Sequence, residues 1–174
     1  MKIVLSNLNF SYDSEHILKD INLTINQGEK VTIVGHSGSG KTTLMNILSN
    51  LVKNQNIKYE IEGQQIDDKK ASRSKIRQEI GITFQLPEHQ IFGRTVLTAA
   101  MNNNTDIEYT KKILKKFNIG EDKLHLSPFA LSEGDKRKLV LSSVFSLNPS
   151  TIFFDEPTSN IDDYSVTDFV KTIN

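Results

Sequence analysis

The stretch "VTIVGHSGSGKTTLMNILSN", Val31 to Asn50, decides the fold of this chain. It opens within a compact apolar run, KVTIVG at residues 30–35, of the kind that forms a strand buried on both faces. Gly35 ends this run, and Gly38, Gly40 and Lys41 follow it. Apolar residues then recur at helical spacing: Leu44, Ile47, Leu48 and Leu51. The sequence therefore predicts a strand, a glycine-rich loop and a helix in immediate succession.

The glycine-rich loop matches the pattern G-x-x-x-x-G-K-S/T. A loop that wraps a triphosphate must aim several backbone N–H groups inward, which requires unusual backbone angles and small side chains. The following helix points its positive end at the phosphates, Lys41 bridges the terminal phosphates, and the Thr42 hydroxyl ligates magnesium. An incidental glycine turn is disfavoured, because both flanking elements stand where the motif requires them. The predicted nucleotide-binding residues here are Gly35, His36, Ser37, Gly38, Ser39, Gly40, Lys41, Thr42 and Thr43.

A second motif, TIFFDEPT, ends an apolar run with Asp155 and Glu156. A carboxylate at the end of a core strand beside a phosphate loop can hold magnesium through water, which is the role we predict for Asp155. The adjacent Glu156 can polarise the attacking water. A strand-end acidic pair that only caps a turn is the alternative, and the phosphate loop in the same chain disfavours it.

Length and composition exclude several classes of protein. The chain has 174 residues, enough for one domain with a proper core, and no apolar run approaches the roughly 18 residues that cross a bilayer. The absence of cysteine excludes a disulfide scaffold and fits a reducing compartment. Lys and Arg number 21, as do Asp and Glu, which argues against a general polyanion binder. The lysines at positions 111, 112, 115 and 116 are interpreted as a solvated helix face, so no nucleic-acid partner is predicted.

Short apolar runs alternate with longer amphipathic ones, which predicts an α/β domain with a parallel central sheet. Further strands are predicted at 2–10, 22–25, 59–63, 79–84 and 150–154. The region 95–146 is mostly helical in pattern, with one helix over 106–119 and another beginning at Ser132, a natural N-cap. A last helix is predicted over 165–173, and the basic piece 69–77 is poorly patterned.

These motifs and four others, in the same order along the chain, make the sequence resemble the ATP-binding cassette (ABC) ATPases from Met1 to the last residue. The additional marks are FSYD, ITFQ, LSEGDKRK and SNID. The resemblance implies that Tyr12 stacks on adenine, that Gln85 joins Glu156 in catalysis, and that Thr42, Gln85 and Asp155 surround Mg²⁺. It also implies that a signature contacts ATP held by a second subunit and that a D-loop crosses the dimer interface. The signature residues are Leu131, Ser132, Glu133, Gly134 and Asp135, and the D-loop residues are Ser159 and Asp162.

The same resemblance implies a P-loop NTPase fold with a RecA-like core, a mixed sheet and an antiparallel β subdomain. We expect one ABC ATPase domain over 1–174, with a helical subdomain at about 94–147 inserted into a core of 1–93 and 148–174. The final core strands are expected to be missing. ATP and Mg²⁺ are the implied cofactors, and the implied activity is ATP hydrolysis coupled to transmembrane transport.

A narrower resemblance is to the ATPases of energy-coupling factor (ECF) transporters, which import vitamins and transition metals. FQLPEHQIFGRTV carries it, and GHSGSGKTT and LSPFALSEGDKRKLVLSSV favour the same group. It implies a peripheral subunit at the cytoplasmic face of the cell membrane. It also implies an integral membrane partner that docks on residues 85–96. A generic ABC importer or exporter ATPase is the alternative.

Two departures from the family pattern bear on mechanism. Glu133 and Asp135 stand where the family has Gly and Gln, so they bring carboxylates to a helix end that should bind phosphate. We therefore expect a dimer with a second ABC ATPase, identical or different, and favour a heterodimer in which this chain's signature forms the weaker site. The family's histidine after the acidic motif is also not found, because all four histidines come earlier and the chain ends at Asn174. We expect weak or absent hydrolysis from the isolated 174-residue chain.

Two other classes of function stay open at this stage. The altered signature and the missing histidine fit a nucleotide-gated regulatory subunit that hydrolyses little. A non-transport family member acting in DNA repair, chromosome structure or translation is disfavoured, since 174 residues hold neither long coiled coils nor two cassettes. A small P-loop kinase or GTPase would not explain Gln85, the signature and the D-loop together.

Overall fold

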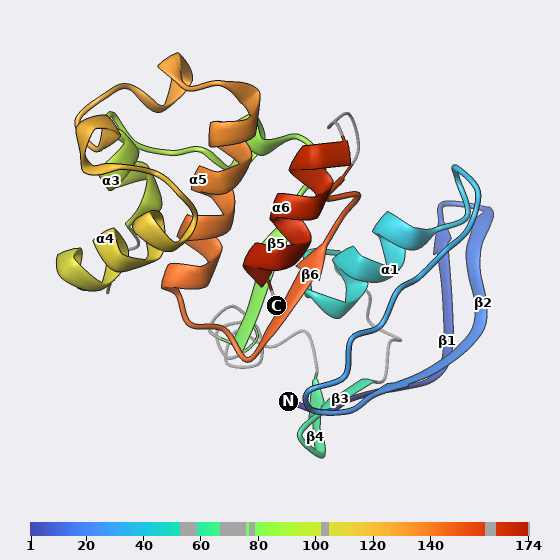
Figure 1. The fold of residues 1–174 in the computed structure, drawn as a ribbon. Coiled ribbons are helices and arrows are strands. Elements are labelled where there is room, and N and C mark those ends of the chain that lie inside the picture. The colour runs from blue at the N-terminus through green and yellow to red at the C-terminus, as the bar shows by residue number, and fades with distance from the viewer. Residues whose placement is uncertain (53–58, 67–75, 77–78, 102–104, 159–162, 174) are drawn as a thin grey trace. The chain divides into compact units, whose positions relative to one another are not determined.

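The computed structural model describes residues 1–52, 59–66, 76, 79–101, 105–158 and 163–173 of the chain. The chain divides into two compact units, Met1–Ile80 and Gly81–Asn174 (Figure 1). The phosphate loop belongs to the first unit. The acidic pair, Gln85 and the signature belong to the second.

The first unit is built on an antiparallel sheet with the strand order β2-β1-β3-β4. Its strands are β1 (Ile3–Tyr12), β2 (Glu15–Ile25), β3 (Tyr59–Ile61) and β4 (Gln64–Ile66). The predicted antiparallel β subdomain is therefore confirmed. β2 begins seven residues earlier than the predicted 22–25, because a two-residue connection at Asp13 and Ser14 pairs Tyr12 with Glu15.

Three register shifts interrupt the pairing of β1 with β2, and asparagine side chains bond to backbone amides at two of them. Asn7 and Asp20 have left-handed backbone angles, φ 50° and 47°, where the register shifts. The Asn7 N–H donates to Asn22 Oδ1 at 2.8 Å, and the Asp20 N–H donates to Asn9 Oδ1 at 3.0 Å. Each bulged amide thus gains a partner in place of the lost ladder bond.

The predicted strand at 30–35 is wrong for this structure, whereas the helix after it is present. Residues 31–36 have no regular secondary structure, and Val31, Ile33 and Val34 are 40%, 45% and 85% exposed. A strand needs a hydrogen-bonded neighbour, and neither sheet of the described residues extends to this run. Helix α1 (Lys41–Leu48) buries Leu44, Ile47 and Leu48 but ends before Leu51, which is half exposed.

The second unit combines a two-stranded sheet with helices (Figure 1). β5 (Ile80–Thr83) pairs with β6 (Thr151–Phe154), so residues about 70 apart in the chain form one strand pair. The remaining elements are η1 (Pro87–Gln90), α3 (Val96–Ala100), α4 (Ile107–Lys116), η2 (Glu121–Lys123), η3 (Pro128–Ala130), α5 (Glu133–Ser146) and α6 (Asp163–Ile173).

Helices α3, α4 and α5 pack around one apolar core within the second unit (Figure 1). Its buried members are Ile91, Val96, Ala99, Ala100, Leu114, Ile119, Leu131, Leu139 and Val140. α5 starts where the sequence predicts, since Ser132 caps it through a bond from the Asp135 N–H to Ser132 Oγ at 3.2 Å. None of the helices in the described part of the chain combines the length and apolarity needed to cross a membrane.

Candidate functional site

The phosphate loop of the first unit has the backbone that its glycines permit. Gly38 and Gly40 have φ values of 78° and 87°, in the left-handed region that favours glycine. A Cβ on Gly40 would lie 2.8 Å from the Leu18 side chain, and one on Gly35 would lie 2.6 Å from Ser39 Oγ. Gly40 is also the N-cap of α1, so the loop leads directly into the positive end of that helix.

Lys41 folds back into this loop. Its Nζ donates to the carbonyl oxygens of Gly35 and His36, each at 2.9 Å. The ammonium group therefore stands inside the curve of residues 35–41, where phosphate oxygens can take the place of the two carbonyls. Thr42 is exposed in the first turn of α1, and Thr43 beside it is half-buried.

Tyr12 lies at the end of β1 and is 47% exposed. Its ring contacts Phe10 edge to face, with centroids 4.8 Å apart. Phe10 itself is buried. The Tyr12 ring is thus held by a core aromatic while much of its surface stays open to a planar ligand.

In the second unit, Gln85 and Glu156 meet although they lie 71 residues apart. The Asp155 N–H donates to the carbonyl of Thr83, the last residue of β5, at 2.9 Å, which extends the pairing one residue past the end of β6. Glu156 then turns with φ 46°, and Gln85 Nε2 donates to Glu156 Oε2 at 2.9 Å. The two predicted catalytic residues are therefore in direct contact.

Gln90 holds the Gln85 segment on the sheet, a role that sequence reasoning missed. Its side chain accepts from the Phe84 N–H at 2.7 Å and donates to the Ile82 carbonyl at 2.8 Å. One amide group thereby takes the place of a neighbouring strand at β5. No sequence pattern predicts this role, because a glutamine that bonds to backbone groups cannot be told from other polar residues in the sequence.

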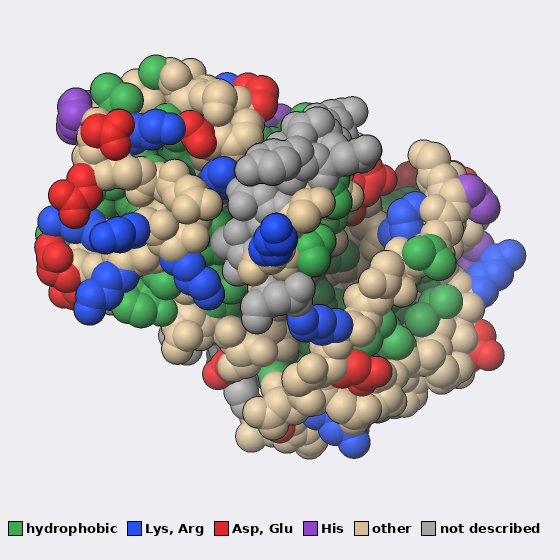
Figure 2. All heavy atoms as spheres, in the orientation of Figure 1, with side chains coloured by type: hydrophobic (Ala, Val, Ile, Leu, Met, Phe, Trp, Pro, Cys, Tyr) green, Lys and Arg blue, Asp and Glu red, His purple; other side chains and the backbone are tan. Residues whose placement is uncertain are grey.

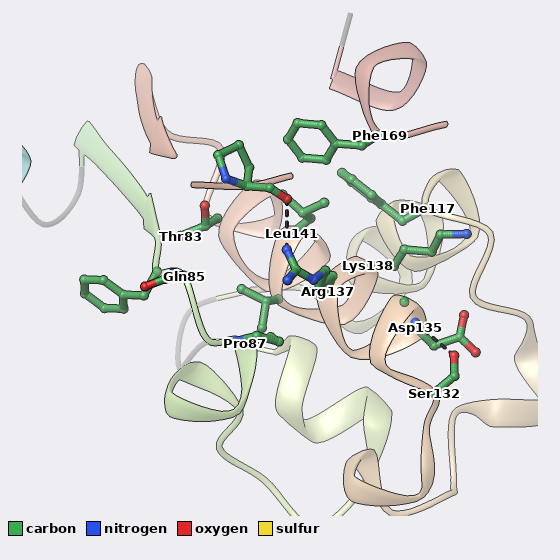
Figure 3. Close-up of a pocket in the computed structure, with 14 residues that line it drawn as sticks. Thr83, Gln85, Pro87, Phe117, Ser132, Asp135, Arg137, Lys138, Leu141 and Phe169 are labelled. Atoms are coloured by element: carbon green, nitrogen blue, oxygen red, sulfur yellow. Dashed lines mark hydrogen bonds between the residues drawn. The ribbon is translucent and has the colours of Figure 1, made fainter. Parts of the chain in front are cut away.

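A cavity of about 220 Å³ lies between the Gln85 segment and the signature helix (Figure 3). Gln85 and Pro87 line it together with Ser132, Arg137 and Leu141 from the start and side of α5. Arg137 Nη1 donates to the Pro157 carbonyl at 2.9 Å, the dashed line in Figure 3. α5 is thus tied to the segment that directly follows Glu156.

The two unusual carboxylates of the signature are both in ion pairs. Lys123 Nζ is 2.7 Å from Asp135 Oδ2, and Lys136 Nζ is 2.6 Å from Glu133 Oε1. Lys136 also reaches Glu88 Oε1 at 3.2 Å. A hydrogen bond to Asp135 raises the pKa of Lys123, and hydrogen bonds to Glu133 and then Glu88 raise the pKa of Lys136. Sequence reasoning identified the carboxylates but neither lysine.

Oxygen donors dominate the residues predicted to surround a metal. Thr42 offers a hydroxyl, Asp155 a carboxylate and Gln85 an amide oxygen, which are the hard ligands that Mg²⁺ prefers. Among the described residues, no group of three or more His, Cys, Asp or Glu is placed to hold a metal ion by itself. This donor set fits a magnesium ion that depends partly on nucleotide phosphates and is less suited to a transition metal.

The remaining predicted positions behave in different ways. Leu131 is buried in the helical core, and Gly134 has open space where a Cβ would lie. Ser159 and Asp162 of the predicted D-loop lie outside the described residues. The lysine-rich run falls on α4, and Figure 2 shows basic side chains interspersed with acidic ones over this helical part. That mixture fits the predicted solvated face.

Comparison with known proteins identifies the family that carries this set of motifs. A family model described as ABC transporter matches residues 18–159, from β2 through the acidic pair. The chain belongs to the ABC transporter family. The α/β fold class and the resemblance predicted from the motifs are thereby confirmed.

Individual ABC proteins match over nearly the whole chain. The energy-coupling factor transporter ATP-binding protein EcfA2 of Caldanaerobacter subterraneus subsp. tengcongensis is 34% identical, over 93% of this chain and 61% of that protein. This chain therefore spans about three fifths of that relative's length. The solved structure of cbiO1 from Clostridium perfringens, part of the ABC transporter complex cbiONQ, is 28% identical with a TM-score of 0.87. That match covers 98% of this chain and 71% of the other.

A second solved structure is a dimeric ATP-binding cassette in a post-hydrolysis state, bound to ADP and Pi. It is 26% identical with a TM-score of 0.83, and the match covers 98% of this chain and 81% of the other.

Proposed function

We propose that this chain is the ATP-binding and ATP-hydrolysing subunit of an ECF-type importer for a vitamin or metal ion. The observation that carries the proposal is the contact of Gln85 with Glu156 at 2.9 Å, in a chain whose phosphate loop surrounds Lys41. The similarity to EcfA2 and to cbiO1 supports the transporter class. The solute is selected by a separate membrane subunit.

In the proposed reaction, loop amides and Lys41 bind the β- and γ-phosphates of ATP, and Tyr12 stacks on adenine. Thr42, Asp155 and Gln85 would hold magnesium, which would neutralise charge that develops on the phosphates. Glu156 accepts a hydrogen bond from the attacking water and orients it toward the γ-phosphate. Gln85 fixes one carboxylate oxygen of Glu156, so the direction of that side chain is set before the water arrives.

The signature acts on a nucleotide bound by a second ABC ATPase. Ser132 and the amides at the start of α5 meet the γ-phosphate held by the partner's phosphate loop, so ATP binds the two chains together. Hydrolysis removes that contact and the dimer opens. We propose a partner different from this chain, because Glu133 and Asp135 depart from the family pattern and would make two composite sites unequal. The dimeric cassette bound to ADP and Pi supports the paired arrangement.

A membrane subunit docks on residues 85–96 in this proposal, at the cytoplasmic face of the cell membrane. Leu86 and Phe92 are 47% and 76% exposed there, so this segment offers apolar surface that a partner can bury. Gln90 anchors the segment to β5. A docked partner can therefore cover the apolar side chains without having to order the backbone that carries them.

Titration calorimetry of the protein with Mg-ATP tests the nucleotide site. Replacing Lys41 by alanine removes a charged partner of the phosphates, which is worth about 1.5–3 kcal/mol. We expect affinity to fall roughly tenfold to 150-fold. Lys111→Ala, which removes a half-buried lysine of α4, should leave affinity unchanged. Absence of heat with the parent protein would overturn the proposal.

Hydrolysis is tested in the complex assembled with its partner ATPase and membrane subunit. Single-turnover ATP hydrolysis separates a working ATPase from a nucleotide-gated subunit. We expect turnover in the parent complex and loss of turnover with retained binding in Glu156→Gln. Subunit masses of the purified complex decide whether the two ATPases are different chains, and two copies of this chain alone would contradict the heterodimer.

A further inference from the structure

The first turn of α5 is subject to two opposing electrostatic demands. Carboxylates at Glu133 and Asp135 stabilise the helix, because they face the positive end of its dipole. A phosphate that binds this helix end uses the same partial charge, so a bare carboxylate there repels it. The chain carries both carboxylates in the segment that the proposed function assigns to the γ-phosphate.

Each carboxylate of the signature forms an ion pair with a lysine that lies outside the five signature residues. Lys123 reaches Asp135 from η2, twelve residues earlier, and the two side chains are only 33% and 20% exposed. Lys136 lies one turn into α5 with its side chain 11% exposed, and contacts Glu133. Limited exposure of both partners reduces the screening of the Lys123–Asp135 pair by water and salt, whereas Glu133 is 68% exposed and its pair with Lys136 is screened more.

Glu88 from η1 completes the group as the second partner of Lys136. The five side chains hold three carboxylates and two ammonium groups, an excess of one negative charge. Removal of either lysine raises that excess to two. The lysines thus determine how much negative charge an approaching phosphate meets.

We propose that Lys123 and Lys136 are positioning residues of the signature: they hold Asp135 and Glu133 in ion pairs so that the start of α5 stays able to bind a γ-phosphate. This inference rests on the proposed function of the signature. The approach to the helix end is open: apart from its chain neighbours and the helix backbone, no atom of the described residues lies within 4 Å of where a Cβ on Gly134 would stand. The acidic signature then works through internal neutralisation, without the Gly and Gln of the family pattern.

Both lysines remain charged wherever the protein would operate. Their carboxylate partners raise the pKa of each above the ordinary 10.5, so the ammonium form persists through neutral and mildly alkaline pH. The ion pairs are therefore not a switch within that range. They are a constant feature of the signature that only substitution removes.

The test is steady-state ATP hydrolysis by the assembled complex carrying Lys123→Met. We expect the KM for ATP to rise about two- to fivefold at low ionic strength, the usual effect of one charge at a helix end. The rise should shrink in 0.5 M salt, where the Debye length is a few ångströms. The double variant Lys123→Met with Asp135→Gln should return KM to the parent value, because it removes the carboxylate that Lys123 neutralised.

Two further variants separate charge from structure. Lys123→Arg keeps the cation and should keep the parent KM. Lys111→Met removes a lysine that pairs with Glu108 at 2.8 Å, with the same i, i+3 spacing as Lys136 and Glu133, but on α4. It should leave KM unchanged.

The possible failures are distinguishable. An active parent complex in which Lys123→Met keeps the parent KM, or in which the double variant is as impaired as the single one, overturns this inference alone. A parent complex with neither ATP binding nor turnover overturns the proposed function and this inference with it.

Discussion

Gly134→Ala should separate the stability of the chain from its activity. The substitution adds one methyl group at the second residue of α5. Apart from the chain neighbours and the helix backbone, no atom of the described residues lies within 4 Å of that methyl, and Gly134 has no left-handed backbone angle. Alanine is the better helix former by up to about 1 kcal/mol, so the fold should be unchanged or slightly more stable.

Gly134→Ala should lower only the ATPase activity of the assembled complex, in which the partner's nucleotide approaches this residue. If the partner's nucleotide packs against Gly134, the methyl must intrude on it, and overpacking of a close contact costs about 1–3 kcal/mol. That corresponds to roughly fivefold to 150-fold in the KM for ATP or in turnover of the assembled complex. Thermal unfolding of the isolated chain should show a midpoint unchanged or raised by at most about 4 °C.

Gly81→Ala is the matched control, because a Cβ there would lie 2.5 Å from Val144 Cγ1 and 3.0 Å from Pro149. It should lower the unfolding midpoint. Full ATPase activity of Gly134→Ala would show that nothing packs closely on the signature, and the assignment of this helix end to the γ-phosphate would be wrong. A destabilised Gly134→Ala would instead contradict the open space seen in the structure.

Three other substitutions test particular contacts. Glu156→Gln keeps the shape that Gln85 contacts but removes the charge, so turnover should fall about 10²–10⁴-fold while Mg-ATP binding in calorimetry persists; turnover near the parent rate would exclude Glu156 as the base. Gly93→Ala forces a Cβ to 2.7 Å from the Ala99 backbone nitrogen at φ 138°, and denaturant unfolding should show a loss of about 1–3 kcal/mol. Gln90→Leu removes the amide that bonds to the Phe84 N–H and the Ile82 carbonyl, so the free energy of unfolding should fall by about 1–3 kcal/mol. An unchanged free energy of unfolding would mean that water replaces the amide.

Local features were predictable from the sequence. The phosphate loop depends on left-handed glycine angles, and the motif predicts them. The start of α5 follows from a serine whose hydroxyl accepts an N–H three residues later. Interactions of this range are encoded by residue spacing, so a single sequence contains them.

Longer-range features were not predictable. The strand expected at 30–35 fails because strand formation depends on a neighbour, and an apolar run alone does not supply one. The ion pair of Lys136 with Glu88 spans 48 residues, and nothing in either residue's surroundings indicates the other. The sequence alone therefore predicted two carboxylates that weaken phosphate binding at the signature, whereas in the folded chain each carboxylate is paired with a lysine.

The segment 85–90 joins the features that the proposed function needs in one place. Gln85 contacts Glu156, Glu88 contacts Lys136 of the signature helix, and Gln90 bonds to β5. Because these three contacts fall within six residues, the segment has little freedom to move without disturbing Glu156 or the ion pairs of α5. A membrane subunit that shifts the adjoining exposed Phe92 would consequently act on hydrolysis and on the signature at once, since both depend on the same short piece of backbone.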